Sequence, residues 1–174
     1  MLDTATHTNA FLVNYCRSLL AEVPDERMTE QPLPGVNHAA WVLGHLAVVA
    51  DGVSEKLGGK KTLPTTWPAL FASGSKPSAT RSLYPSREEL LRALEQRYED
   101  LRQRAATASP EQLSQPTTSP RAKETLPTFK EFLAFLLTGH VGGACWPAFV
   151  LAAHDRVAAA VLNLHCPSVC IYEG

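Results

Sequence analysis

Apolar positions recur every three or four residues in four stretches of the chain, which is the spacing of one face of an α-helix. The first stretch covers residues 4–22 and carries its apolar residues at Phe11, Leu12, Tyr15, Leu19 and Leu20. Pro24 ends it. The second covers residues 38–57, after Asn37, which we expect to cap the helix, and before Gly58, which stops it.

Two further helices begin with the pattern S/T-x-x-E, in which the two side chains bond each other's backbone N–H groups. Ser86 and Glu89 open a helix over residues 86–106, and Thr128 and Glu131 open one over residues 128–141. Pro110 follows a serine and predicts one short helical turn between them.

The connection from Lys60 to Pro85 is rich in proline, serine, glycine and threonine and is too long for a tight turn. In a four-helix bundle such a segment is a crossover between helices two and three. No useful strand-type alternation is present. We therefore expect an all-α four-helix bundle that forms a single domain over residues 1–174.

The composition narrows the class of protein. The 174 residues are 45% hydrophobic and carry a formal net charge of −1, which gives no reason to expect a nucleic-acid or membrane partner. No apolar run reaches transmembrane length, and residues 1–8 lack the basic start and apolar core of a signal peptide. We expect a cytoplasmic protein whose four cysteines are thiols.

Two histidines are predicted to point into the core. Trp41, His45 and Val49 are four residues apart and share one helix face, which the apolar members turn inward. His140 lies on the apolar stripe of the last helix, in line with Leu136. Neutral imidazole is a good zinc or nickel ligand, so His45 and His140 are candidate metal ligands. The alternative is a pair of hydrogen-bonded core histidines.

The segments L-P-G-V-N-H-A-A-W-V-L-G-H-L-A and L-P-T-F-K-E-F-L-A-F-L-L-T-G-H-V resemble the second and fourth helices of DinB/YfiT-like proteins of the DinB superfamily. The resemblance runs from about Phe11 to Val141 and includes Y-P-S-x-x-E-L at the third helix. It implies a four-helix bundle, often dimeric. It also implies a divalent metal held by three histidines, one on helix two and an H-x-x-x-H pair on helix four.

By position, His45 matches the first ligand and His140 the first member of the pair, with Trp41 as a wall of the cofactor pocket. Some members of the family are thiol-dependent transferases or isomerases. The resemblance thus implies a low-molecular-weight thiol and a small electrophile as partners. If the chain is active, it is a metal-dependent thiol S-transferase-like enzyme. The alternative function is a non-catalytic stress-associated or interaction protein.

The chain departs from the family after Val141. Ala144 stands where the second histidine of the pair is expected, so we predict a metal site that is weak or absent. Gly142, Gly143 and Pro147 are poor helix residues, and we expect a break between Gly142 and Pro147. Cys145 and His154 are the nearest replacements for the third ligand. His165, Cys166 and Cys170 are too few and too poorly spaced for a zinc site.

We interpret the departure as a change of reading frame. Trp146 is encoded by TGG and proline codons begin with C, so reading from the second base gives GGC, a glycine codon. With allowed synonymous codons, residues 144–156 re-read as H-A-G-Q-L-S-S-W-R-R-M-T-G, which supplies the missing histidine. The alternative is a genuinely divergent tail over residues 144–174.

Overall fold

The computed structural model describes residues 2–21, 23–119, 122–145 and 150. Its long helices are α1 (Leu2–Leu20), α2 (Ala39–Lys56) and α4 (Arg87–Thr107). The last rod is composite: α6 (Phe129–Phe135) continues through a π-helical turn (Leu136–His140) into α7 (Val141–Ala144). Shorter helices are α3 (Trp67–Phe71), α5 (Pro110–Ser114) and the 3-10 turns Asp25–Thr29 and Arg81–Leu83. The all-α prediction is confirmed: within the described ranges, pairing of β type is limited to one isolated bridge, Pro116 to Thr128.

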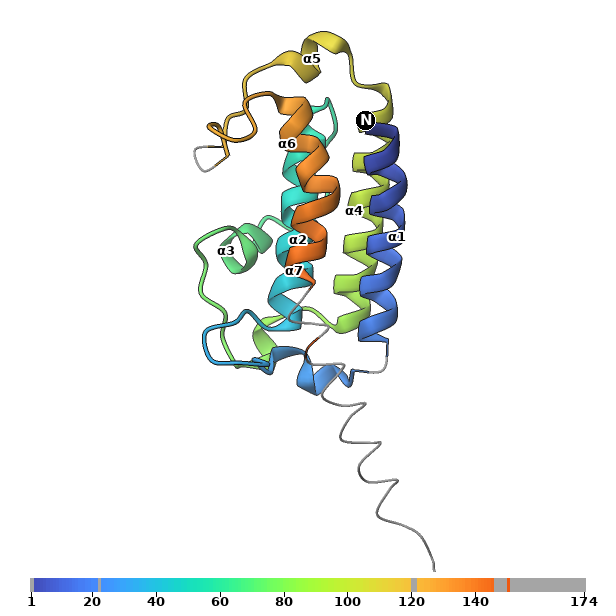
Figure 1. Cartoon of the computed structure of the whole chain (residues 1–174). Helices are drawn as coiled ribbons and strands as arrows, with labels where there is room; N and C mark the ends of the chain where they lie inside the picture. The colour runs from blue at the N-terminus through green and yellow to red at the C-terminus, as the bar shows by residue number, and fades with distance from the viewer. Residues whose placement is uncertain (1, 22, 120–121, 146–149, 151–174) are drawn as a thin grey trace, which may run out of the picture.

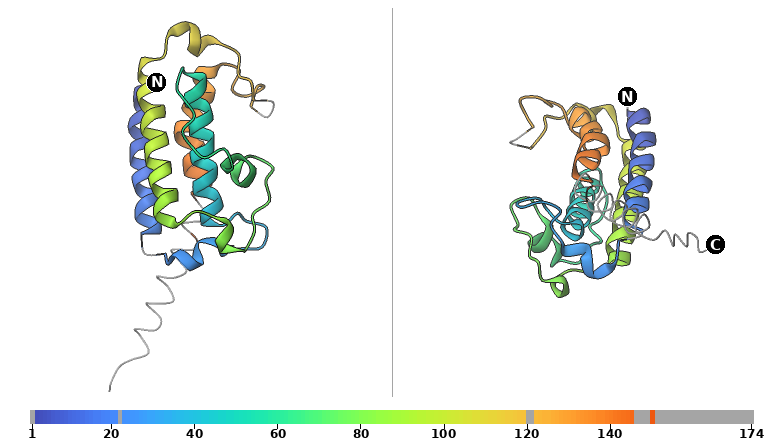
Figure 2. Two further views of the ribbon diagram at one scale, coloured as in Figure 1. Left: turned by 180° about the vertical axis from the view of Figure 1, so that it is seen from behind. Right: turned by 60° about the horizontal axis from the view of Figure 1, so that its bottom comes forward.

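The three long helices and the composite rod lie side by side (Figure 1). α1 runs against α2, whereas α2 and α4 run in the same direction, and the composite rod returns alongside α1 (Figures 1 and 2). Two parallel helices require the intervening chain to travel the length of the molecule. The residues between α2 and α4 do so, with α3 packed on α2 (Figure 2). The predicted crossover is confirmed.

The core is one apolar cluster to which all the long helices contribute. Its completely covered side chains include Leu43 and Leu46 of α2, Leu94 and Tyr98 of α4, and Leu133 of α6. Burial of such side chains is the main stabilising term of a bundle, at roughly 1.5–3 kcal/mol for each large one.

The buried face of α1 differs from the stripe that the sequence suggested. Asn9, Val13 and Cys16 are covered, whereas Phe11 and Tyr15 are 67% and 43% exposed. The two exposed rings stack on each other, with their centroids 6.1 Å apart. A polar residue, Asn9, therefore occupies a core position.

The helix starts follow the predicted chemistry in most cases. The reciprocal Thr128–Glu131 capping box is present. Of the predicted Ser86–Glu89 box one half is seen, in which the Ser86 hydroxyl accepts a hydrogen bond from the Glu89 N–H. Asn37 was expected to cap α2, but His38 does so: its Nδ1 accepts from the Trp41 N–H, and its Nε2 bonds the Ser78 carbonyl. The imidazole is preferred because it also reaches the crossover. The stop after α2 is confirmed, since Gly58 adopts φ +83°, a left-handed conformation that favours glycine.

The composite rod stays helical through Gly142 and Gly143 to Ala144, so the predicted break does not begin at Gly142. Its irregularity comes earlier, at the π turn. The remainder of the predicted break, including Pro147, lies outside the described residues, as does most of the tail. Among the described residues, no helix is long and apolar enough to cross a membrane.

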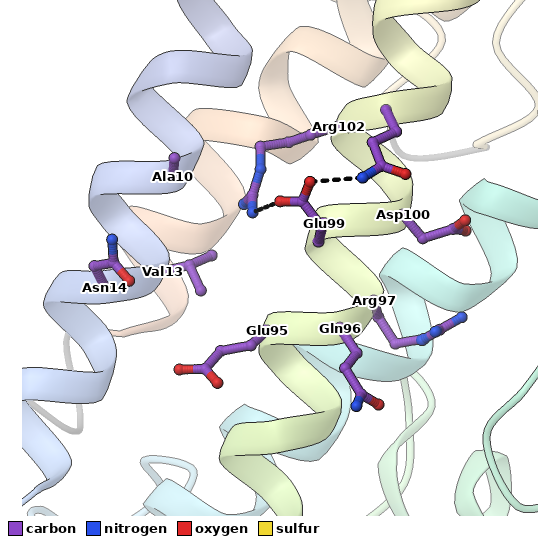
Figure 3. Close-up of a pocket in the computed structure, with 10 residues that line it drawn as sticks. Ala10, Val13, Asn14, Glu95, Gln96, Arg97, Glu99, Asp100 and Arg102 are labelled. Carbon is purple, nitrogen blue, oxygen red and sulfur yellow. Dashed lines mark hydrogen bonds and ion pairs between the residues drawn. The ribbon is translucent and has the colours of Figure 1, made fainter.

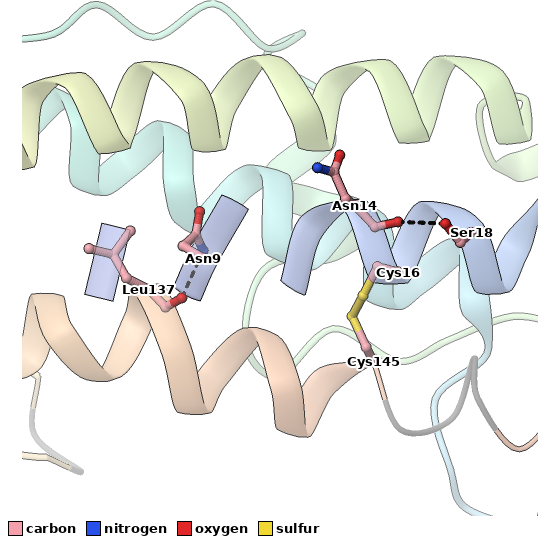
Figure 4. The surroundings of a disulfide bond; sticks show 6 residues. All are labelled: Asn9, Asn14, Cys16, Ser18, Leu137 and Cys145. Atoms are coloured by element: carbon pink, nitrogen blue, oxygen red, sulfur yellow. Dashed lines mark hydrogen bonds between the residues drawn. A yellow bond between two sulfur atoms is a disulfide. The ribbon is translucent and has the colours of Figure 1, made fainter. Parts of the chain in front are cut away.

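A disulfide joins Cys16 of α1 to Cys145, the residue after α7 (Figure 4). Their Cα atoms are 6.2 Å apart, within the range that a disulfide spans. The expectation of free thiols is wrong for this pair. No pattern in the sequence predicts this bond, because 129 positions separate the two residues and only the packing of α7 against α1 brings them together. Cys166 and Cys170 lie outside the described residues.

Candidate functional site

His45 is held inside the molecule by two contacts that fix its ring. The ring stacks on that of Trp41, with 4.6 Å between centroids and 9° between planes. Its Nδ1 lies 2.7 Å from the carbonyl oxygen of Phe71 in α3. A carbonyl only accepts hydrogen bonds, so Nδ1 carries the proton and the lone pair remains on Nε2.

Gly44 allows the approach of α3 that makes this bond. A Cβ atom built on Gly44 would meet the Phe71 ring at 2.3 Å, a distance that real Cβ contacts do not show. The absence of a side chain at position 44 thus lets Phe71 lie against α2 beside His45. The indole of Trp41 is also held by the crossover, because its Nε1 donates to the hydroxyl of Ser75, which follows α3, at 2.8 Å.

His140 faces His45 from the composite rod. The two ring centroids are 5.4 Å apart, and their planes make an angle of 63°. The Nδ1 atom of His140 is buried and has no hydrogen-bond partner. A buried ring nitrogen without a partner costs roughly 1–3 kcal/mol, and a bound ion or water would satisfy it.

Both imidazoles are neutral at pH 7. Burial lowers the pKa of His45, although the bond to the Phe71 carbonyl opposes the shift. Burial, followed by the charge of His45, lowers the pKa of His140 to about 4. Two neutral imidazoles 5.4 Å apart offer lone pairs rather than positive charge to whatever lies between them.

The histidines line a cavity of about 540 Å³. Most of its wall is apolar and comes from α6, the π turn and the segment before α6, with hydroxyl groups at Ser73, Ser119 and Thr125. Trp41, expected as a pocket wall, is not among the lining residues, because it lies behind the His45 ring. The cavity has the size of a small-molecule site.

The described residues do not supply the three-histidine metal site that the resemblance implies. Among the residues that the structure describes, no group of three or more histidine, cysteine, aspartate or glutamate side chains is placed to hold a metal ion. Cys145 is bonded to Cys16 and is unavailable as the third ligand, and His154 lies outside the described residues. The two imidazoles remain, and one of them has a buried ring nitrogen without a partner.

A separate groove between α1 and α4 has a different character (Figure 3). Its side chains neutralise one another: Arg102 pairs with Glu99, and Gln103 donates to the same carboxylate at 2.8 Å. Arg17, further along α1, pairs with Glu95 across it. The groove resembles a solvated charged surface rather than a site for a charged ligand.

The sequence identified the two histidines and the Trp41 neighbour but missed the groups that orient them. The Phe71 carbonyl is a backbone atom and leaves no mark on the sequence. Ser75 lies in the crossover, where no periodicity places a residue relative to α2. Gly44 is the signal that was available, since a glycine inside a helix often marks close packing.

One family model matches the chain, that of the DinB superfamily, over residues 14–141. No curated protein and no solved structure matches it in the corresponding comparisons. The match includes His45 and His140 and ends three residues before Ala144, where the departure from the family pattern begins. With the helical fold, the crossover and the paired histidines in place, this match shows that the chain belongs to the DinB superfamily.

Proposed function

We propose that the chain binds a divalent metal ion weakly through His45 and His140, at the inner end of the apolar cavity. The observation that carries the proposal is the facing of two neutral imidazoles, one with a buried, unpartnered nitrogen. The Phe71 carbonyl supports it, because a ligating histidine commonly donates its other N–H to such a group, which fixes the tautomer and the ring orientation.

Each residue of the proposed site has a separate role. His45 and His140 would hold zinc or nickel, and Trp41 orients His45 by stacking on it. When bound, the metal supplies Lewis acidity and stabilises the thiolate form of a low-molecular-weight thiol. The cavity walls, including Phe132 and Leu136, would hold a small apolar electrophile away from water. The proposed reaction class is thiol S-transfer or isomerisation, impaired by the missing third ligand.

A non-catalytic role is the second candidate, and one observation favours it. Three protein ligands plus an open position is the usual arrangement of a catalytic zinc site, and the described residues provide two. A stress-associated or interaction protein that has kept the bundle but not the active metal would look the same. We expect a homodimer for either function. The cytoplasmic location expected from the sequence is at odds with the Cys16–Cys145 disulfide, because disulfides are rare in a reducing cytoplasm.

Metal titration of the purified chain tests the proposal. We expect Zn²⁺ or Ni²⁺ to bind the wild-type protein, measured by calorimetry after chelator treatment. His45→Ala and His140→Ala each abolish binding, whereas His7→Ala, at an exposed histidine of α1, leaves it unchanged. Absence of binding by the wild-type chain, or binding that survives both cavity variants, refutes the metal site.

An activity assay separates the two functions. The metal-loaded protein is mixed with cysteine as the thiol and monochlorobimane as the electrophile, and the fluorescent thioether is measured. A rate above that of the metal-free protein, lost in His45→Ala, supports the transferase. Metal binding without any rate supports the non-catalytic role.

A further inference from the structure

The π turn that ends at His140 leaves one backbone carbonyl without its helical partner. In a regular α-helix the Val141 N–H would bond the carbonyl of Leu137, four residues earlier. Here the Val141 N–H bonds the Thr138 carbonyl instead. The Leu137 carbonyl is therefore available to a donor from elsewhere, and a buried carbonyl needs one.

Asn9 of α1 is that donor. Its Nδ2 lies 2.8 Å from the Leu137 carbonyl oxygen, and the side chain is completely buried (Figure 4). A polar side chain in the middle of the buried face of α1 is costly unless it is satisfied, so this bond accounts for an otherwise misplaced residue.

Arg102 of α4 fixes the direction of the Asn9 amide. Its Nη1 donates to the Asn9 Oδ1 at 2.8 Å, and the same guanidinium pairs with Glu99 (Figure 3). Turning the amide over would place two donors against each other and an oxygen against the Leu137 carbonyl. The guanidinium thus keeps the Asn9 N–H groups aimed at the π turn.

The disulfide shows that the turn is needed for the register of the two helices. Asn9 and Cys16 are seven residues apart on α1, which brings them within about 20° of the same helix face. Their partners Leu137 and Cys145 are eight residues apart, which in a regular helix leaves them about 80° out of line. A π turn takes up one residue, and this restores the alignment (Figure 4).

We propose that Asn9 is a positioning residue, which holds the Leu136–His140 turn in its π conformation and thereby aims His140 at His45. If the Val141 N–H instead donated to the Leu137 carbonyl, as in a regular α-helix, the end of the turn would rotate by roughly 90° relative to α6. The His140 ring would then leave the cavity. The functional meaning of this step rests on the proposed metal site, but the geometry does not.

The test uses metal-free, chelator-treated protein, so that it is independent of metal binding. Nuclear Overhauser effects (NOEs) between the ring protons of His45 and His140 report their approach, since their centroids are 5.4 Å apart. We expect these signals in the wild type and their loss in Asn9→Asp, which keeps the acceptor for Arg102 but lacks the donor. Asn9→Leu, which lacks both, should behave in the same way.

Val13→Ala is the matched control, because it removes buried volume from the same helix and leaves the Asn9 amide intact. We expect it to lower the melting temperature and to keep the ring-to-ring signals. Retention of the signals at wild-type intensity in folded Asn9→Asp overturns the proposal.

Arg102→Gln decides the question if the Asn9 variants do not fold, because it leaves Asn9 in place and releases its amide. We expect weakened signals, and full retention overturns the proposal. Failure of the metal site would look different: the wild-type chain would show the ring-to-ring signals and bind no metal.

Discussion

The carbonyl oxygen of Phe71 lies 2.7 Å from the Nδ1 atom of His45, so a residue of the crossover sets the tautomer of a histidine in the core. This relationship depends on Gly44, whose missing side chain leaves room for the Phe71 ring. The crossover is therefore part of the site and not only a connection.

Gly44→Ala should separate α3 from α2. The new methyl group would meet the Phe71 ring at 2.3 Å, and overpacking of this kind costs roughly 1–3 kcal/mol. Urea unfolding monitored by circular dichroism measures the loss. Gly52→Ala is the control: it lies in the same helix with open space around its Cα, and should stabilise the protein by up to about 1 kcal/mol. Equal effects of the two substitutions would contradict the packing account.

His140 should make stability fall in weakly acidic solution. Its pKa is lowered to about 4 in the folded protein, against about 6.5 when unfolded, so the unfolded state binds more protons between these values. The contribution of neutral His140 to the free energy of unfolding is fully present above pH 6.5. It declines by roughly 2–3 kcal/mol as the pH falls toward 4. Urea unfolding of metal-free protein at several pH values measures it. His140→Leu should show a shallower decline, and an unchanged decline would show that other groups cause it.

Breaking the disulfide should destabilise the chain strongly. The bond closes a loop of 129 residues, and constraint of so long a loop in the unfolded state contributes roughly 3–5 kcal/mol. A reducing agent, or Cys16→Ser, should lower the melting temperature measured by calorimetry. A Cys166→Ser/Cys170→Ser double variant is the control and should keep the full response to reductant. A wild-type chain that releases four reactive thiols on denaturation without reductant would contradict the pairing.

Ala144→His should strengthen metal binding. Ala144 lies four residues after His140 along the described helix α7, and residues four apart share a face. Because changes in the groups around a metal alone alter affinity by about 10–100-fold, a new ligand should raise it by at least about tenfold. Calorimetric titration with Zn²⁺ measures the gain, and Gly143→His, turned away by one position, should show none.

The reading-frame interpretation has its own test. Replacement of residues 144–156 by H-A-G-Q-L-S-S-W-R-R-M-T-G should increase both bound metal and melting temperature, and resequencing of the gene checks the frame directly. If the repaired chain gains neither metal nor stability, the tail is a genuinely divergent one.

The fold was predictable wherever local signals and burial agree. Thr128 and Glu131 predict a helix start, and Gly58 predicts a helix end. The buried face of α1 was not predictable, because Phe11 and Tyr15 are apolar yet exposed, and Asn9 is polar yet buried. Asn9 is buried because it bonds a carbonyl on another helix, and the periodicity of α1 alone cannot reveal such a partner.

The site was predictable to the level of its two imidazoles. Helical spacing placed His45 and His140 on inward faces, and the structure brings their rings together. The π turn was not predictable, because the apolar stripe through Leu133 and Leu136 is typical of a regular α-helix. The disulfide was missed for the same reason as the Phe71 bond: both join segments that only tertiary packing makes neighbours.

The route of the crossover places hydroxyl groups of the cavity wall on a different part of the chain from the two imidazoles. Since α2 and α4 run in the same direction, the connecting chain returns along the length of the bundle (Figure 1), and its residue Ser73 forms part of the cavity wall. The segment before α6 contributes Ser119, Ala122 and Thr125 to the same wall. The two imidazoles and the apolar side chains of Phe132 and Leu136 stand on helices, whereas the hydroxyl groups of the wall belong to connecting segments. Exchange of these connecting residues would thus alter the polarity of the cavity and leave the helices that carry the imidazoles as they are.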